Sequence, residues 1–102
     1  MTFTADDFLT IEVFEQLNRE FAEVAGRRGA TGVVQLNLVQ GFATVPDAAF
    51  INRIERNIDQ IAARAPHIRI AQTKVWQGGA NDRVRLNFND ANRWFASLAS
   101  LR

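Results

Sequence analysis

Residues 44–66 read TVPDAAFINRIERNIDQIAARAP, and this stretch holds the most clearly marked helix of the chain. Its isoleucines recur every three or four positions, which is the spacing of one face of an amphipathic helix: Ile51, Ile54, Ile58 and Ile61. Thr44 is a capping residue, Pro46 suits a first helical turn, and Pro66 stops the pattern. The stretch therefore predicts a helix that packs an isoleucine stripe into a core.

An Asn-Arg pair inside this stretch occurs twice more in the chain. The three copies are Asn18-Arg19, Asn52-Arg53 and Asn92-Arg93. In each copy an aliphatic residue follows the Asn after six positions: Val24, Ile58 and Leu98. Each copy lies in an amphipathic helical stretch, so the repetition favours a scaffold of similar helices over a single catalytic pocket.

Two further helices are expected on either side of the central one. The first begins near Thr4 or Thr10 and ends at Gly26 and Gly29, and its apolar stripe is Phe14, Leu17, Phe21 and Val24. The last is capped by Asn87 and Asp90, and its apolar residues are Ala91, Trp94, Phe95, Leu98 and Leu101. All three helices are predicted to face a common core.

The stretches between the helices predict short strands. Apolar and polar residues alternate over residues 33–39 and again over residues 83–88, and residues 68–76 read as extended. Gly78 and Gly79 introduce a turn that could close a hairpin. The expected fold is thus α+β: three amphipathic helices packed on a small, mostly antiparallel sheet, in the order α-β-α-β-β-α.

Composition fits a single domain over residues 1–102. Hydrophobic residues make up 47% of the chain and charged residues 23%, as in ordinary folded proteins, and there is no cysteine to form a disulfide or a thiolate metal site. No apolar run reaches the roughly 20 residues of a membrane span. Residues 1–7 carry two acids and no basic cluster, unlike a secretory signal, so a cytoplasmic origin is expected.

Residues suited to catalysis are sparse. His67 is the single histidine, and Ser97 and Ser100 are placed on the last helix and not at a strained turn. No phosphate-binding loop or dinucleotide fingerprint is present. The sequence therefore predicts a protein that is not an enzyme, with no metal and no cofactor.

Two sets of polar residues are candidates for binding. If Val34, Leu36, Val84 and Leu86 face the core, Arg83 and Arg85 lie on the outer face of the sheet, where they either contact phosphates or are simply solvated. The second set is the Asn-Arg pairs: Asn52, Arg53, Asn92 and Arg93. Their side chains either bond the backbone of a neighbouring loop or partner subunit, or face water.

The middle motif resembles a class of small phage and prophage tail proteins. Residues 52–58 read NRIERNI, close to the wording Asn-Arg-Ile-Glu followed by Asn-Ile in that class, with Pro46 and Asp47 upstream. The segment from Phe88 to Trp94, which follows Lys74-Val75-Trp76, is similar. The copy at Asn18 departs most. The resemblance implies a part of a tail tip, baseplate or fibre attachment without catalytic activity.

The function expected from the sequence is that of a structural subunit which assembles through protein–protein contacts. Its partners would be other protein subunits, with a homo-oligomer or particle as the product, and its location a virion or tail-like particle. Nucleic acid is a less favoured partner because the net charge is only +1. The alternatives are a small nucleic-acid-binding or regulatory domain that uses Arg83 and Arg85, and an immunity or inhibitor protein.

Overall fold

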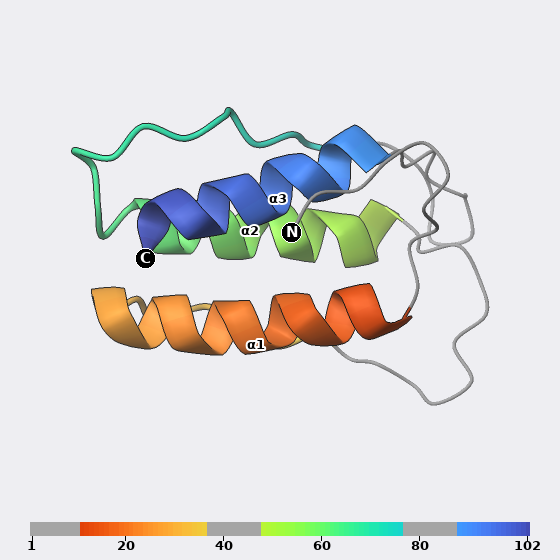
Figure 1. The fold of residues 1–102 in the computed structure, drawn as a ribbon, viewed down its shortest axis with the longest axis horizontal. Coiled ribbons are helices and arrows are strands. Elements are labelled where there is room, and N and C mark those ends of the chain that lie inside the picture. Colours follow the sequence, from red (N-terminus) through yellow and green to blue (C-terminus); the bar gives the residue numbers. More distant parts are fainter. Residues whose placement is uncertain (1–10, 37–47, 77–87) are drawn as a thin grey trace.

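The computed structural model describes residues 11–36, 48–76 and 88–102, which contain three α-helices (Figure 1). The helices are α1 (Ile11–Arg28), α2 (Ala48–Ala62) and α3 (Phe88–Leu101). All three run in the same direction, so their carboxyl ends gather at one end of the molecule (Figure 1). The described parts of the two connections are residues 29–36, here called the first segment, and residues 63–76, the second segment.

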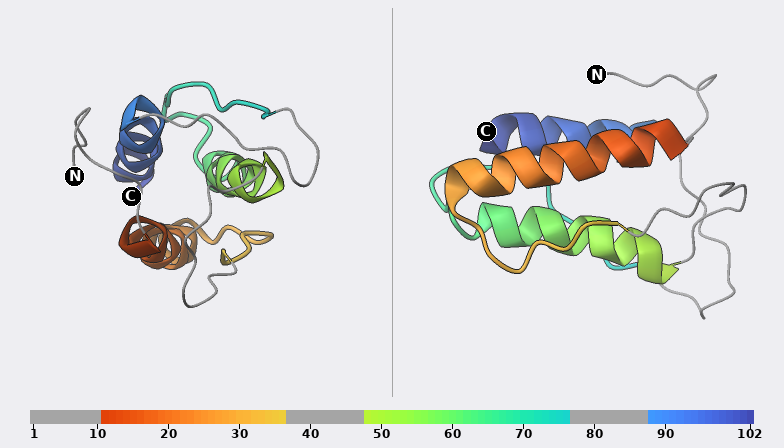
Figure 2. Two further views of the ribbon diagram at one scale, coloured as in Figure 1. Left: turned by 90° about the vertical axis from the view of Figure 1, so that its right-hand side faces the viewer. Right: turned by 90° about the horizontal axis from the view of Figure 1, so that it is seen from below.

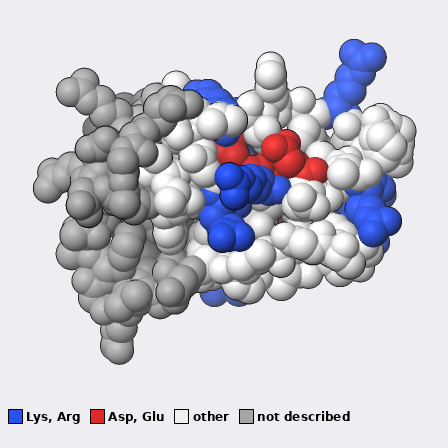
Figure 3. All heavy atoms as spheres, turned by 180° about the vertical axis from the view of Figure 1, so that it is seen from behind, with Lys and Arg blue, Asp and Glu red and all other residues white. Residues whose placement is uncertain are grey.

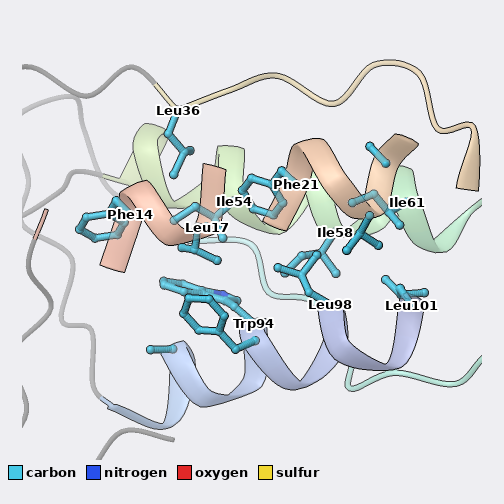
Figure 4. Packing of buried hydrophobic residues seen from close by; sticks show 14 of the residues in the cluster. Phe14, Leu17, Phe21, Leu36, Ile54, Ile58, Ile61, Trp94, Leu98 and Leu101 are labelled. Carbon is cyan, nitrogen blue, oxygen red and sulfur yellow. The ribbon is translucent and has the colours of Figure 1, made fainter. Parts of the chain in front are cut away.

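The apolar stripes predicted from the sequence form the core. Phe14, Leu17, Phe21 and Val24 of α1 are at most 1% exposed, and the four isoleucines of α2 are fully buried. Trp94 and Leu98 point from α3 toward the side chains of α1 and α2 (Figure 4). Phe14 also meets the edge of Phe50, with ring centroids 5.1 Å apart and planes at 89°. The three helices thus share one hydrophobic core, which supplies most of the driving force for folding.

The end of α1 shows why the chain turns back there. Gly29 has a φ of +64°, a backbone conformation that glycine adopts without steric cost. The N–H of Ala30 donates to the carbonyl of Ala25 at 2.9 Å, and that of Gly29 reaches the carbonyl of Gly26. This is the Schellman arrangement, which satisfies carbonyls at a helix end. Of the two predicted terminators, Gly29 ends the helix, whereas Gly26 lies within it.

The end of α2 is a tight turn ahead of Pro66. The N–H groups of Arg64 and Ala65 donate to carbonyls three residues earlier, each at 3.0 Å, and Ile68 does the same to Ala65. These bonds tighten the last turn and redirect the chain into the second segment. Ala65 is fully buried and His67 is exposed.

The predicted α+β fold is wrong in the described part of the chain, because residues 11–36, 48–76 and 88–102 form no β-strand. Residues 33–36 and 68–76 do leave the helical conformation, as predicted, but neither pairs with another strand. Phe88 begins α3 instead of ending a strand. The rest of the predicted hairpin, including Arg83 and Arg85, lies outside the described residues, as do residues 37–39.

The two segments lie in grooves between helices. Viewed along the bundle, the helices occupy the corners of a triangle, with the first segment outside α1 and α2 and the second outside α2 and α3 (Figure 2). Hydrogen bonds from helix side chains hold both in place. The hypothesis of an outward-facing set of arginines assumed that Val34 and Leu36 both face the core. Leu36 is buried, but Val34 is 44% exposed and does not. None of the described helices is long and apolar enough to cross a membrane.

Candidate functional site

Asparagine side chains of the helices bind the backbone of the first segment. The side-chain amide of Asn18 on α1 donates to the carbonyl of Leu36 at 3.0 Å, and its oxygen accepts from the N–H of Leu36 at 2.7 Å. Asn57 on α2 makes the same two bonds with Val34, at 2.7 and 3.0 Å. Each Asn thus engages both backbone groups of one residue. We call this two-bond unit an amide clamp.

A third amide clamp holds the second segment. The side chain of Asn52 on α2 donates to the carbonyl of Trp76 at 3.0 Å and accepts from its N–H at 2.8 Å. One turn of α2 further on, Glu55 accepts from the N–H of Lys74 at 3.3 Å. After another turn, Asp59 accepts from the hydroxyl of Thr73 at 2.8 Å. The second segment therefore follows one stripe of α2 and runs antiparallel to it.

The carboxylate of Glu55 is the centre of a concentrated polar cluster. Glu55 is only 2% exposed and receives both terminal nitrogens of Arg93 on α3, at 2.7 and 2.6 Å. The indole N–H groups of Trp76 and Trp94 donate to the same carboxylate, at 2.9 and 3.1 Å. With the N–H of Lys74, five donors surround one buried charge. A buried ion pair is tolerated when its remaining hydrogen-bonding groups are satisfied in this way.

Asp90 extends this cluster at the start of α3. It is 3% exposed and accepts from the ammonium group of Lys74 at 3.0 Å and from Arg93 at 3.4 Å. The Lys74 ammonium also lies 5.5 Å from the ring centroid of Trp76, within reach of a cation–π interaction. The second segment is thus fixed to α2 and α3 by backbone, indole and ammonium groups together.

The cluster is charged at neutral pH. Burial alone raises the pKa of the Glu55 carboxyl group, but the hydrogen bonds from Arg93, Trp76 and Trp94 outweigh burial and hold the pKa below its usual 4.5. The hydrogen bond to Glu55 raises the pKa of Arg93 against the opposing effect of its burial. A carboxylate held in the ionised form, with both oxygens occupied, is poorly suited to give or take a proton. The geometry instead fits a structural lock.

The residues predicted from the Asn-Arg pairs have different surroundings. Asn52 bonds a neighbouring connection within the chain, one of the outcomes that the sequence left open. Arg93 is 12% exposed and is committed to Glu55 and Asp90, although its Nε atom has no hydrogen-bond partner. Arg53 is exposed, and Asn92 is half-buried. The structure therefore commits Asn52 to the second segment and Arg93 to Glu55 and Asp90, and it leaves Arg53 at the surface.

Sequence reasoning missed Glu55, Asn57 and Trp76 as partners in these contacts. Glu55 lies four residues after Ile51 and three before Ile58, so it sits on the edge of the isoleucine stripe. A charge inside an apolar stripe is a signal of a buried ion pair, since an unpaired one would be costly. Asn57 shares that stripe and carries the same kind of signal. Nothing in the pattern around Trp76 identified its indole as a donor to Glu55.

On the face that carries α2, the described residues form no patch of a single sign of charge (Figure 3). Basic and acidic side chains lie beside one another near the centre of that face (Figure 3). Such a mixture gives little of the long-range attraction that draws proteins to nucleic acid. Among the described residues, no group of three or more metal-binding side chains is close enough to hold an ion.

Comparison of the chain with known proteins found no matching family model, no matching curated protein and no matching solved structure.

Proposed function

We propose that this protein is a non-catalytic assembly module that joins other protein subunits through its clamped segments. The proposal is supported by a pattern along both segments, in which every second residue has its backbone N–H bonded to a helix side chain. Val34, Leu36, Lys74 and Trp76 turn their N–H groups toward the helices and are bonded there. Successive peptide groups of an extended chain point to opposite sides, so the intervening residues turn theirs outward.

Gln35 and Val75 are those intervening residues. No hydrogen bond involves their backbone N–H groups within the described part of the chain. Val75 is also 79% exposed, and Val34 beside Gln35 is 44% exposed. A fixed extended segment with an open edge and aliphatic side chains is a surface to which a partner can add a strand. The clamps support this role because they order the segment before a partner arrives, which lowers the entropy cost of binding.

The resemblance of residues 52–58 to phage tail proteins supports a phage tail or tail-like particle as the assembly. In a ring or fibre each subunit repeats the same contact, so modest affinities per contact add up. On this proposal the protein works within a virion or a tail-like particle, with copies of itself or other tail subunits as its partners.

The test is the mass of the purified chain in solution, measured by light scattering over a wide range of concentrations. We expect the average mass to rise with concentration, and Val75→Lys to suppress that rise, because a charge on an open edge blocks strand addition. Gln72→Lys is the matched control, since Gln72 is exposed on the same segment. A strict monomer at every concentration would contradict the proposal, as would equal association of the two variants.

A further inference from the structure

The arginines of α2 differ from those of the other two helices in their surroundings. Within α1 and α3 every arginine side chain bonds another group of the chain: Arg19, Arg27, Arg28 and Arg93. Arg53 and Arg56 of α2 are exposed, and no hydrogen bond or ion pair within the described part of the chain involves their side chains. The helix therefore presents two guanidinium groups whose donors are open to a partner.

Each of these two arginines stands beside one of the clamped segments. Arg53 lies four residues before Asn57, which clamps the first segment. Arg56 lies four residues after Asn52, which clamps the second segment. Residues four apart are neighbours on the surface of a helix. The order across the outer face of α2 is therefore first segment, Arg53, Arg56, second segment.

Both segments carry an exposed valine. Val34 on the first segment is 44% exposed, and Val75 on the second is 79% exposed. Basic side chains lie near the centre of this face of the molecule (Figure 3). Two cations without a partner thus have an open aliphatic side chain on either side of them.

The acidic side chains of α2 are turned to other groups. Glu55 is buried against Arg93, and Asp59 accepts from the hydroxyl of Thr73 on the second segment. The two free guanidinium groups therefore suit carboxylates brought by a partner, which arginine binds through two parallel hydrogen bonds. Because charges of both signs lie on this face, its long-range pull on a polyanion is weak, and protein carboxylates fit better than nucleic acid.

We propose that the outer face of α2 binds an acidic segment of a partner subunit, which crosses the helix from the first segment to the second. On the side that faces α2, this segment presents an aliphatic residue, two carboxylates and another aliphatic residue. They meet, in order, Val34, Arg53, Arg56 and Val75. The inference rests on the proposed assembly function and names the chemistry of the partner.

An extended segment has the spacing that these contacts need. Its alternate residues lie on one side roughly 6.6 Å apart, and the Cβ atoms of helix residues three apart, such as Arg53 and Arg56, are separated by about 5–6 Å. An extended heptapeptide spans about 20 Å, enough to cross a helix roughly 10–12 Å in diameter. The helix fixes the backbone of both arginines beforehand, which lowers the entropy cost of binding.

The probe is a fluorescently labelled, end-capped peptide, Val-Ser-Glu-Ser-Glu-Ser-Val, titrated into the full chain and followed by anisotropy. We expect saturable binding. Arg53→Glu combined with Arg56→Glu should weaken it by about tenfold or more, because two attractive contacts become repulsive. Arg53→Gln combined with Arg56→Gln removes the charges without reversing them and should give a smaller loss. A peptide with glutamine in place of both glutamates should also bind more weakly.

The matched control is Arg64→Glu combined with Arg69→Glu. It changes the net charge of the chain by the same amount, at two exposed sites beyond the end of α2. The affinity for the peptide should stay nearly unchanged in this variant, because exposed charges act over only about 8 Å at physiological salt. Circular dichroism checks that all variants fold, as expected for changes at exposed positions.

Any of four results would overturn this inference. They are no saturable binding of the glutamate peptide, equal loss in the two glutamate double variants, equal binding of the glutamate and glutamine peptides, and tighter binding of a labelled single-stranded oligonucleotide than of the peptide. Light scattering on the same samples separates this inference from the proposed function. Absence of peptide binding with concentration-dependent association intact removes the acidic partner alone, whereas peptide binding to a strict monomer removes the assembly proposal alone.

Discussion

An asparagine side chain can stand in for the edge of a neighbouring strand. Its amide offers one donor group and one acceptor close together, as a peptide group does. Asn18, Asn52 and Asn57 each use both, with all six distances between 2.7 and 3.0 Å. The segments therefore satisfy their backbone groups without a sheet, which explains why extended sequence patterns here do not lead to β-structure.

The three Asn-Arg pairs look alike in sequence, but their arginines differ in consequence. Arg93→Ala should lower the free energy of unfolding by about 3–5 kcal/mol, because it leaves the buried carboxylate of Glu55 without its main partner. Arg53→Ala removes an exposed side chain and should change the free energy of unfolding by less than about 0.5 kcal/mol. Urea denaturation of the two variants checks this. Equal effects would contradict the assignment of Arg93 as the partner of a buried charge.

The lowered pKa of Glu55 makes stability depend on pH. A carboxyl group whose pKa is lower in the folded than in the unfolded state stabilises the fold fully above its unfolded pKa, near 4.5, and loses this contribution as the pH falls through its folded pKa. Glu55→Gln should lower the free energy of unfolding by about 3 kcal/mol at neutral pH. The difference in unfolding free energy between this variant and the wild type should narrow as the solution is acidified below pH 4.5.

The measurement is a series of urea denaturation curves for both proteins from neutral to acidic pH. A gap that stays constant across the series would show that the ionised form of Glu55 is not what stabilises the fold. Asp59→Asn is a useful control, since Asp59 is an exposed carboxylate on the same helix and its side chain accepts from the hydroxyl of Thr73.

At the scale of elements, the helices were predictable and the partners of the segments were not. The stripes of α1, α2 and α3 are visible because a helix buries residues at a local, fixed spacing. The clamps join residues 18, 23 and 24 positions apart and depend on which groove a segment enters. The isoleucine stripe revealed that α2 is buried. It could not reveal that Asn57 binds the first segment, which precedes α2, or that Glu55 binds the second segment, which follows it.

The turn after α1 gives a prediction at this scale. Gly29→Ala should destabilise the protein by about 1 kcal/mol, because alanine is strained at a φ of +64° even though open space surrounds the site. Gly26→Ala should instead stabilise it by roughly 0.5–1 kcal/mol, since Gly26 lies inside the helix and a methyl group there meets nothing within 4 Å. Thermal unfolding of the pair should show midpoints shifted in opposite directions, and shifts of the same sign would contradict this account.

At the scale of the whole molecule, parallel helices require each connection to return along the bundle. This arrangement also places three sets of terminal carbonyls at one end. These carbonyls have no donor within their own helices. Arg28 of α1 supplies some of the donors, since its guanidinium donates to the carbonyls of Leu101 and Arg102 at 2.6 and 2.9 Å. Cationic side chains near helix carboxyl ends are favourable for the same reason. The returning segments, held in the grooves by side chains, are what make the parallel arrangement possible.

Native-state hydrogen exchange, resolved residue by residue by NMR, tests the amide clamps most directly. The clamps predict slow exchange for the N–H groups of Val34, Leu36 and Trp76 and fast exchange for those of Gln35 and Val75. Asn18→Ala should speed the exchange of the Leu36 N–H, Asn57→Ala that of Val34, and Asn52→Ala that of Trp76. In each variant the N–H groups of the helices should keep their protection. Continuous protection along both segments, or protection that survives the loss of its asparagine, would contradict the account.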